Sequence, residues 1–531
     1  MKPTRSWSRG AAALAATTAL CLPALAAAQE ITIVREVDSN NYDPHRSTAR
    51  AATEVLFMIG DTLVTLEPDM QTIAPGIAES WDVSDDGLVY TFHLKEGVQF
   101  CDGKEMTADD VVYSLERWID PETASPVAWR AGDVESITAI DDRTVEYRLD
   151  APFTELLYQL TQSFATVIDR ENVEELGEDF GINGFNGTGP FCWESWTPRD
   201  RLVITRHEAY DWGPPWYENQ GPAHMERISW QIVPEESTRT VALMTGQTQV
   251  TQYVPHIALQ QLRDAPNIEV QRHDEAFWTY FMGFKVDRET VADEDVRRAM
   301  NLAVDQEALA EDLFFGEVEP AYSYVSTAAL DWDPELEEHL LRHDPEEANR
   351  ILDEAGWERG PDGVRQKDGV RLEPVTYVFA GSTWGKISEA VQADLLEIGV
   401  AMDIHAFDAT VAWGQMATQD FDIFGMSYPY ITAGEALNLY FRSENMPTPN
   451  RMNWDDEETD ELLQAGKTAL DEEERFSNYA QVLRKVHDAA VWIPLYHEPM
   501  YIAHSTDLEP VQPHNNYGAG LYKGLDLRFR D

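Results

Sequence analysis

Basic residues are scarce in this 531-residue chain. Lysine and arginine together number 40, against 95 aspartates and glutamates, which gives a formal net charge of -55. A surface of that sign repels nucleic acid and anionic lipid, so we expect neither as a partner. Because the acids are spread along the whole chain, adaptation to a salt-rich environment explains them better than selection of a cationic ligand.

Cysteine is nearly absent. The chain has three cysteines, and one of them, Cys21, lies in the N-terminal leader described below. The remaining pair, Cys101 and Cys192, is too small a set for a structural zinc site. In an exported protein such a pair commonly forms a disulfide, so we predict a bond between Cys101 and Cys192 and no bound metal.

Long apolar runs are lacking after the first residues. Lys2, Arg5 and Arg9 precede the run "AAALAATTALCLPAL", and small residues follow up to Ala28. This pattern predicts a secretory signal peptide over residues 1–28, cleaved after Ala28. No later stretch is apolar enough to span a bilayer, so we expect a soluble protein exported to the periplasm.

The short motifs of common enzyme families are also missing. The chain has no GxSxG, HExxH, CxxC, Walker A or EF-hand pattern, and its 13 histidines do not fall at metal-ligand spacings. His497 in "PLYHEP" is the most tempting base, but it follows an apolar run and is interpreted as structural. We therefore favour a binding protein without cofactors. A secreted hydrolase with paired carboxylates is the alternative.

The content of hydrophobic and aromatic residues is high enough to form large buried cores. Hydrophobic residues make up 43% of the chain and aromatic residues 11%, and the length predicts two or three domains. A strand is predicted over 31–37 and an amphipathic helix over about 47–60. Asp86-Gly87 lies between two strand-like runs, which predicts a β-hairpin.

The stretch "GVQFCDGKEMTADDVVYSLERW" at 97–118 is rich in acids and invites a catalytic interpretation. Thr107, followed by acids, is typical of a helix N-cap. The apolar positions then repeat at helical spacing, at Val111, Leu115 and Trp118. Capping and solvent exposure account for the acids, so we interpret the stretch as a capped helix on a core.

The second half of the chain alternates strands and helices. Strands are predicted over 277–286, 373–381, 400–409 and 421–430, and helical segments over 293–314, 384–399 and about 456–490. This order predicts an α/β body with βαβ units.

The stretch at 97–118 resembles the signature of a known family. It is similar to a stretch of the extracytoplasmic solute-binding proteins of peptide/nickel-type ABC transporters, family 5, which include oligopeptide- and dipeptide-binding proteins. "GTGPF" at 187–191, "VPEESTRTVALMTGQ" at 233–247, "DEDVRRAMNLAVDQEAL" at 293–309 and "VQADLLEIGVAMDI" at 391–404 match the same family in the same order.

The resemblance implies a two-lobed α/β fold, the type II periplasmic-binding-protein fold, with a β-rich subdomain inserted in lobe I. We expect lobe I from 29–65, 211–272 and 503–531, the insert over 66–210, and lobe II over 273–502. The chain would cross between the lobes just before the aromatic strand 277–286 and return close after His497.

The resemblance also implies a mechanism and partners. The lobes close around a small solute and present it to the membrane subunits of an ABC permease, and no bond is made or broken. We expect a monomer.

The nature of the solute stays open. Peptide binders of the family hold the ligand ammonium with an aspartate after a lobe II strand, but here that place reads "SYPYITAGEALN", and Glu435 is the nearest acid. The solute is therefore a peptide, an opine-like conjugate or an oligosaccharide.

Position in the implied fold gives the candidate ligand-binding residues. They follow the first strand, lie on the aromatic strand, open a lobe II helix or lie near the missing aspartate. The candidates are Asp38, Asn40, Asn41, Trp278, Tyr280, Trp384, Lys386, Trp413, Tyr428, Tyr430 and Asn438.

Overall fold

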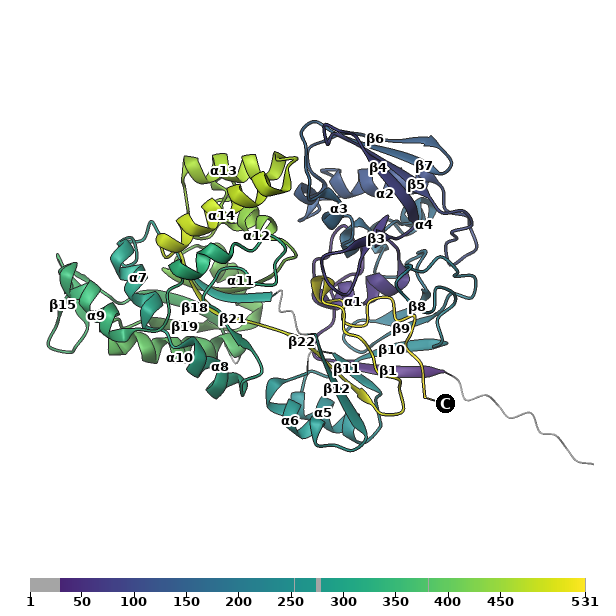
Figure 1. Ribbon diagram of the computed structural model, residues 1–531. Helices are drawn as coiled ribbons and strands as arrows, with labels where there is room; N and C mark the ends of the chain where they lie inside the picture. Colours follow the sequence, from purple (N-terminus) through teal and green to yellow (C-terminus); the bar gives the residue numbers. More distant parts are fainter. Residues whose placement is uncertain (1–28, 253, 274–277, 381, 531) are drawn as a thin grey trace, which may run out of the picture.

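The computed structural model describes residues 29–252, 254–273, 278–380 and 382–530 (Figure 1). The predicted signal peptide, residues 1–28, lies outside this part of the chain. Two bodies stand side by side, each built on its own sheet, and we name them lobe I and lobe II. The predicted two-lobed α/β fold is confirmed.

Lobe I is built on a seven-stranded sheet. Its strands in spatial order are β12 (Ile268–His273), β22 (Met500–Ser505), β11 (Val250–Gln252), β1 (Glu30–Arg35), β10 (Arg227–Ile232), β9 (Arg201–Arg206) and β8 (Phe191–Thr197). The first strand, β1, is parallel to both of its neighbours, β10 and β11, and the outer pairs are antiparallel. The helices associated with this sheet are α1 (Arg50–Ile59), α5 (Glu236–Met244) and α6 (His256–Arg263).

The segment between β1 and β8 carries an additional, mostly antiparallel part. It contains the β2 (Val64–Leu66) and β3 (Ile73–Pro75) pair and a sheet of β4 (Ala78–Val83), β5 (Val89–Leu94), β7 (Thr144–Leu149) and β6 (Val134–Asp141). Its helices are α2 (Ala108–Ile119), α3 (Leu156–Gln159) and α4 (Arg170–Leu176). The insert boundaries 66–210 stay a prediction, but β8 and β9 lie before residue 210 and belong to the sheet of lobe I.

The acid-rich stretch at 97–118 contains a capped helix, as expected. The carboxylate of Asp110 accepts hydrogen bonds from the backbone N–H of Thr107, at 3.0 Å, and from its hydroxyl. Val111, Leu115 and Trp118 of α2 are buried in one apolar core that runs through lobe I and the insert. The stretch is scaffold, because capping and packing use its key residues.

Cys101 and Cys192 are bonded, with their Cα atoms 5.7 Å apart. Cys101 lies in the turn before α2, and Cys192 lies on β8. The disulfide therefore ties the insert to the sheet of lobe I.

Lobe II is built on a six-stranded sheet. Its strands in spatial order are β14 (Glu319–Pro320), β21 (Trp492–His497), β13 (Trp278–Phe284), β20 (Ile423–Pro429), β18 (Val375–Phe379) and β19 (Asp403–Phe407). A small sheet of β15 (Glu358–Arg359), β16 (Arg365–Lys367) and β17 (Val370–Arg371) lies at its periphery. Its helices are α7 (Glu294–Ala303), α8 (Gln306–Phe314), α9 (Pro345–Glu354), α10 (Thr383–Glu397), α11 (Ala409–Ala417), α12 (Ala433–Phe441), α13 (Glu457–Thr468) and α14 (Glu472–Asp488).

The single late helix predicted over about 456–490 is wrong, because the chain forms α13 and α14 instead. Asp471 caps the second helix by accepting a hydrogen bond from the Glu474 N–H at 2.9 Å. Three glutamates follow this cap in the first turn of α14, which favours a helix start there. The two helices pack against each other beside α12.

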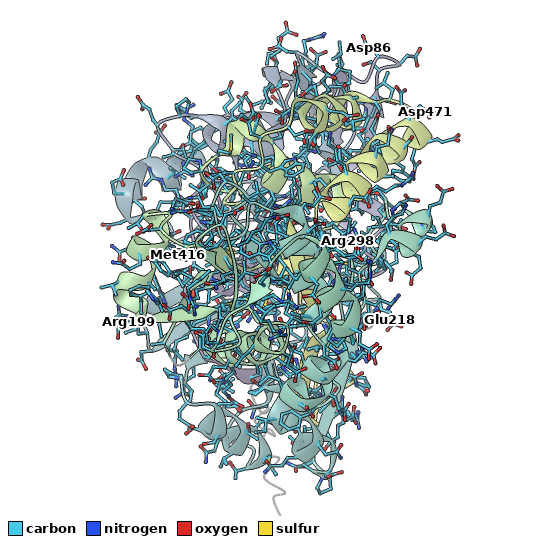
Figure 2. The ribbon with its side chains drawn as sticks, turned by 90° about the vertical axis from the view of Figure 1, so that its left-hand side faces the viewer. Asp86, Arg199, Glu218, Arg298, Met416 and Asp471 are labelled. Atoms are coloured by element: carbon cyan, nitrogen blue, oxygen red, sulfur yellow. A yellow bond between two sulfur atoms is a disulfide. The ribbon has the colours of Figure 1, made fainter. Side chains whose placement is uncertain are left out.

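The lobes are joined by two neighbouring strand connections. One connection runs from β12 of lobe I to β13 of lobe II, and the other from β21 back to β22 through Glu498 and Pro499 (Figure 1). Seen from the lobe II side, Asp86 of the insert and Asp471 of α14 lie at the same end of the molecule (Figure 2). Within the described residues, no helix has both the length and the apolar character that crossing a bilayer requires.

Candidate functional site

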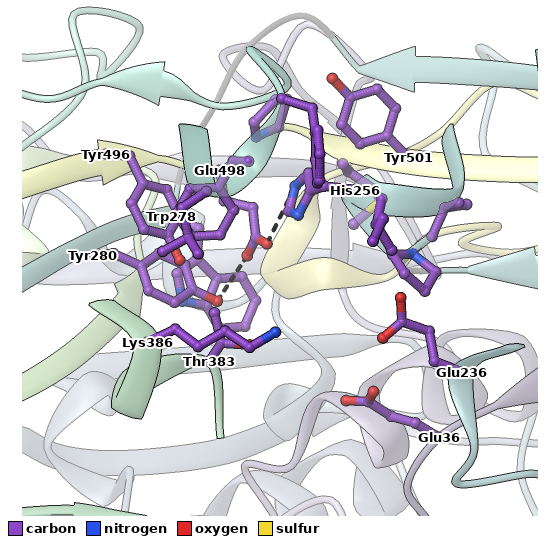
Figure 3. Close-up of a pocket in the computed structure, with 18 of the residues that line it drawn as sticks. Glu36, Glu236, His256, Trp278, Tyr280, Thr383, Lys386, Tyr496, Glu498 and Tyr501 are labelled. Atoms are coloured by element: carbon purple, nitrogen blue, oxygen red, sulfur yellow. Dashed lines mark hydrogen bonds and ion pairs between the residues drawn. The ribbon is translucent and has the colours of Figure 1, made fainter. Parts of the chain in front are cut away.

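A cavity of about 450 Å³ lies between the lobes beside the strand connections. Both lobes contribute to its walls (Figure 3). We call it the solute cavity. The residues that line it are Glu36, Arg50, Glu236, Arg239, Val254, Pro255, His256, Ile257, Trp278, Tyr280, Asp312, Leu313, Phe314, Phe315, Thr383, Lys386, Tyr496, Glu498, Pro499, Met500, Tyr501 and Asn515.

Aromatic rings of lobe II form one wall. Trp278 and Tyr280 alternate along β13, so their side chains share a face of the sheet. The Tyr280 ring stacks on Tyr496 of β21, with centroids 4.4 Å apart. The Tyr280 hydroxyl donates a 2.7 Å hydrogen bond to Glu498, which fixes the ring at the strand connection (Figure 3).

Charged groups of lobe I form the facing wall. Glu36 directly follows β1, and Glu236 begins α5. Arg239 donates to the carbonyls of Val233 and Pro234 and lies 3.3 Å from the Glu36 carboxylate. The Glu36 side chain is nevertheless 53% exposed, so its carboxylate is available to a second cation.

Lys386 brings the opposite charge from lobe II. It lies in the first turn of α10, where the unsatisfied backbone N–H groups add to its positive potential. Lys386 has no ion pair or hydrogen bond among the described residues, and its side chain is exposed. In Figure 3 its ammonium group points into the open space that the carboxylates of Glu36 and Glu236 also face.

One contact links the two walls directly. The Arg50 guanidinium, at the start of α1, lies 5.3 Å from the centre of the Trp278 ring, within the range of a cation–π interaction. The indole N–H of Trp278 is buried and has no hydrogen-bond partner in the described part of the chain. This N–H is a donor that a bound solute can use.

Three predicted ligand-binding residues line the cavity: Trp278, Tyr280 and Lys386. Trp384 is not among the lining residues, but the centroid of its ring lies 5.7 Å from that of Tyr280, which does line the cavity. Trp413 lies in α11, and its side chain is outside the described part of the structure. The ligand-binding roles stay predictions.

Asp38, Asn40 and Asn41 do not line the solute cavity. The Asp38 carboxylate is held by Tyr42, by the indole of Trp196 and by the backbone N–H of Arg199, at 2.8 to 2.9 Å. Burial works against its ionisation, but these hydrogen bonds outweigh burial and lower the pKa of Asp38. Asn40 is exposed, and Asn41 bonds within its own loop. This loop therefore has a structural role beside Glu36.

Tyr428 and Asn438 lie at a second contact between the lobes, and Tyr430 is buried in the core of lobe II. Thr279 lies between Trp278 and Tyr280 on β13, so its side chain points to the opposite face of the sheet. There its hydroxyl forms a 2.6 Å hydrogen bond with the hydroxyl of Tyr430. Asn438 is buried in α12 and donates to the Gly434 carbonyl. The packing of these residues against protein groups separates them from the solute cavity.

Glu435 is buried at the same contact and already has a cation. Arg130, from the insert, bonds Glu435 and Tyr428 of lobe II and donates a 2.8 Å hydrogen bond to Gln159 of lobe I. The side chains of Arg130 and Glu435 are both 1% exposed. Glu435 is therefore not free to hold the ammonium group of a solute while it is paired with Arg130.

Several cavity residues were missed by the sequence analysis, notably Glu36, Glu236, His256, Tyr496 and Glu498. Glu498 directly follows His497, which the sequence analysis considered as a catalytic base and interpreted as structural. His497 is instead buried, and its ring bonds the Thr279 hydroxyl at 3.0 Å. Burial lowers the pKa of His497 to about 4, so the ring is neutral near pH 7.

Among the residues that the structure describes, two clusters have the residue types of a metal site, but neither fits one. Lys104 places its ammonium 2.9 Å from Asp110 and 2.8 Å from Asp169 and also bonds Glu171, so a cation of the protein itself already contacts all three carboxylates of that cluster. The sulfurs of Cys101 and Cys192 near His207 are engaged in the disulfide.

Comparison with known proteins relates the whole chain to one family. Residues 72–447 match the family model for bacterial extracellular solute-binding proteins, family 5. The chain is 27% identical over 509 residues to the glutathione-binding protein GsiB of Salmonella typhimurium, with 93% of each chain covered. It is 26% identical over 508 residues to di/tripeptide-binding protein 2 of Pseudomonas aeruginosa, covering 89% of this chain and 90% of the relative.

Solved structures share the fold. The structure of NikZ from Campylobacter jejuni in complex with Ni(L-His) superposes with a TM-score of 0.80 at 21% identity. The match covers 94% of this chain and 99% of the other.

Proposed function

Because the chain belongs to the bacterial extracellular solute-binding proteins of family 5, we propose that it captures a small zwitterionic, peptide-like solute between its lobes. It then delivers the solute to the membrane subunits of an ABC importer. The family model describes solute-binding proteins, which supports binding rather than catalysis as the role of this chain. The names of the relatives, which include glutathione and di/tripeptide binders, support a peptide-like solute.

The observation that carries this proposal is the distribution of charge over the solute cavity. Lys386 and the α10 N-terminus lie on the lobe II wall together with Asp312, and Glu36 and Glu236 lie on the lobe I wall together with Arg50 and Arg239. Lys386 and Glu236 have no ion pair among the described residues. A solute with a carboxylate and an ammonium group can bind both walls at once, whereas an uncharged sugar uses neither charge. The volume of about 450 Å³ lies within the common range for small-molecule sites, about 300–1,000 Å³.

Binding would favour closure by ordinary linkage. A solute that contacts both walls interacts with more groups in the closed form than in the open form, so it shifts the equilibrium toward closure. The aromatic wall of Trp278, Tyr280 and Tyr496 would exclude water and pack on the apolar part of the solute. The two strand connections would serve as the hinge.

Isothermal titration calorimetry with a matched set of ligands tests the proposal. The set contains a tripeptide with free termini, its N-acetylated form, its C-terminal amide, an opine and an oligosaccharide. We expect the free tripeptide to bind, and each blocked form to bind at least tenfold more weakly. Tighter binding of the oligosaccharide than of every charged ligand would contradict the proposal.

Mass spectrometry of the bound solute distinguishes a binding protein from the alternative, a secreted hydrolase. The solute is released by denaturation after a long incubation with the protein. We expect it to be recovered unchanged. Steady accumulation of a cleavage product would support the hydrolase.

The location in the cell follows from the N-terminal sequence rather than from the described structure. We propose that residues 1–28 direct export and are removed, and that the protein acts in the periplasm as a monomer. The excess of acids fits a salt-rich environment. Sequencing the N-terminus of the exported protein checks the cleavage, and a melting temperature that rises with salt concentration supports the adaptation.

A further inference from the structure

The second contact between the lobes contains more buried carboxylates than buried cations. We name this contact the Arg130 junction, formed by Arg130, Glu155, Gln159 and Tyr517 of lobe I and by Asp331, Tyr428, Thr432 and Glu435 of lobe II. Figure 1 shows α3 of the insert and α12 of lobe II on facing sides of the two bodies, and Glu155 and Thr432 lie just before these helices. Glu155, Asp331 and Glu435 are each at most 3% exposed, and Arg130 is the buried cation among them.

Arg130 compensates Glu435, but it does not contact the other two carboxylates. Besides Glu435, its guanidinium bonds Tyr428 and Gln159 and the Tyr517 hydroxyl, the last at 2.5 Å. These contacts use both terminal nitrogens of the guanidinium group, each of which bonds one group of lobe I and one of lobe II. Glu155 and Asp331 must therefore be stabilised in another way.

Asp331 has donors suited to an ionised carboxylate. The backbone N–H groups of Ala433 and Gly434, at the start of α12, donate to its two oxygens, the second at 2.9 Å. Burial still raises the pKa of Asp331 above its ordinary value, although these N–H donors oppose the shift.

Glu155 has a weaker set of partners. The Thr432 hydroxyl donates to it at 2.6 Å across the lobe boundary, and Glu155 forms no ion pair among the described residues. Burial first, and then the Asp331 carboxylate, raise the pKa of Glu155 to about 7. The ionisable groups around it are Tyr158, Asp331, Glu435, Arg475 and Tyr479, and across a small adjoining cavity Arg442, Glu444 and Lys467.

From these contacts we propose that closure of the two lobes takes up a proton at Glu155, so that acidification strengthens the Arg130 junction. Opening separates Glu155 on lobe I from Asp331 and Glu435 on lobe II. Water then surrounds the Glu155 carboxylate, and its proton affinity returns toward that of an ordinary glutamate.

The sign of the effect follows from linkage. The closed form binds one more proton than the open form at pH values between the ordinary glutamate pKa, about 4.3, and the value in the closed form. Closure is therefore favoured as the pH falls through neutrality. The closed-to-open ratio changes by up to about tenfold per pH unit in this window, which is the limit for one proton.

Small-angle X-ray scattering of the solute-free protein between pH 5.5 and 8.5 tests the proposal. The inference rests on the hinge motion of the proposed function, but the absence of solute separates it from the identity of the ligand. We expect the radius of gyration of the wild-type protein to increase as the pH rises from 5.5 to about 7, because the closed form loses its additional proton in this range, and to level off above it. A radius that does not change with pH would overturn the proposal.

Variants identify the group that takes up the proton. Glu155→Gln, the neutral equivalent of the protonated acid, keeps the Thr432 contact and should stay closed up to pH 8.5. Glu444→Gln, at an exposed glutamate beside the same junction, should respond like the wild type. A pH response of Glu155→Gln equal to that of the wild type would contradict the proposal.

Asp331→Asn is a second test that does not depend on the folding of the first variant. Removing the neighbouring negative charge lowers the proton affinity of Glu155, so the opening transition should move to lower pH. An unchanged midpoint would assign the proton to another group.

Discussion

The two lobes meet on opposite faces of strand β13, and the two contacts are built in different ways. On the face of Trp278 and Tyr280 they enclose the solute cavity, in which Lys386 and Glu236 have no ion-pair partner among the described residues. On the face of Thr279 they form the Arg130 junction, where Arg130 and Glu435 are paired and buried. We call the solute cavity the hollow contact and the Arg130 junction the filled contact. Both lie between the same two lobes.

The difference separates two tasks. In the filled contact the protein supplies both charges itself, so that contact stabilises the closed form whatever the solute is. In the hollow contact the charges of Lys386 and Glu236 remain without ion-pair partners among the described residues, so a solute with both charges adds stability only when the lobes are closed. We therefore expect the solute cavity to determine which solute binds, and the Arg130 junction to determine the position of the open–closed equilibrium.

Arg130→Met should break the filled contact and have the largest effect. It leaves Glu435 buried without a cation, which costs about 3–5 kcal/mol in the closed form. The lobes should therefore open in the absence of solute, with a larger radius of gyration and weaker binding of every ligand. Arg143→Met, at an exposed ion pair with Glu96, is the control and should change neither quantity. Loss of affinity for one class of ligand alone would show that Arg130 acts in selectivity.

Cys101→Ser combined with Cys192→Ser should lower stability without touching either contact. The disulfide joins residues 91 positions apart, both on lobe I, so its loss should cost about 2–4 kcal/mol of unfolding free energy. Chemical denaturation measures this loss, and solute affinity should stay within about twofold of the wild type. A much larger drop in affinity would mean that the disulfide also positions the cavity walls.

Asp38→Asn should separate the loop after β1 from the solute cavity. Since hydrogen bonds lower the pKa of Asp38, its ionised form contributes stability above the ordinary aspartate pKa of about 3.9, and this contribution is lost as the pH falls through the lower value. We expect the variant to lose about 1–3 kcal/mol at pH 7 and less below pH 3. Wild-type solute affinity at pH 7 should remain. A large loss of affinity would place Asp38 in the site after all.

Glu236→Gln should have the smallest effect of the set and concerns the hollow contact alone. Because Glu236 is exposed, removal of its charge should weaken binding of a free tripeptide by about 1 kcal/mol, or roughly fivefold. The N-acetylated tripeptide, which has no ammonium group, should bind the variant and the wild type equally. Equal losses for the two peptides would show that Glu236 does not face the ammonium group.

Local patterns in the sequence predicted much of the fold. The N-cap at Thr107, the turn at Asp86-Gly87 and the alternating aromatic strand from Trp278 depend on residues close in sequence, and each forms as expected. The break between α13 and α14 was also local, since Asp471 followed by glutamates is typical of a helix start, but the apolar periodicity on both sides concealed it.

The contacts between the lobes could not be predicted in the same way. Arg130 and Glu435 are 305 positions apart, and no local pattern distinguishes Arg130 from other arginines. Tyr428 and Tyr430 were predicted to bind the ligand because they lie near the place of the missing aspartate. In the structure they lie on the Thr279 face of β13, on the side of the Arg130 junction. Glu36 and Glu236 come together only because β1 and α5 belong to one lobe.

The measurement that tests the central claim most directly is a thermodynamic cycle between the solute carboxylate and Lys386. Calorimetry gives the affinities of a free tripeptide and of its C-terminal amide, each for the wild-type protein and for Lys386→Met. If the carboxylate binds Lys386 in the solute cavity, amidation weakens binding to the wild type by at least tenfold but has little effect on the variant. An equal penalty for amidation in both proteins would contradict the account.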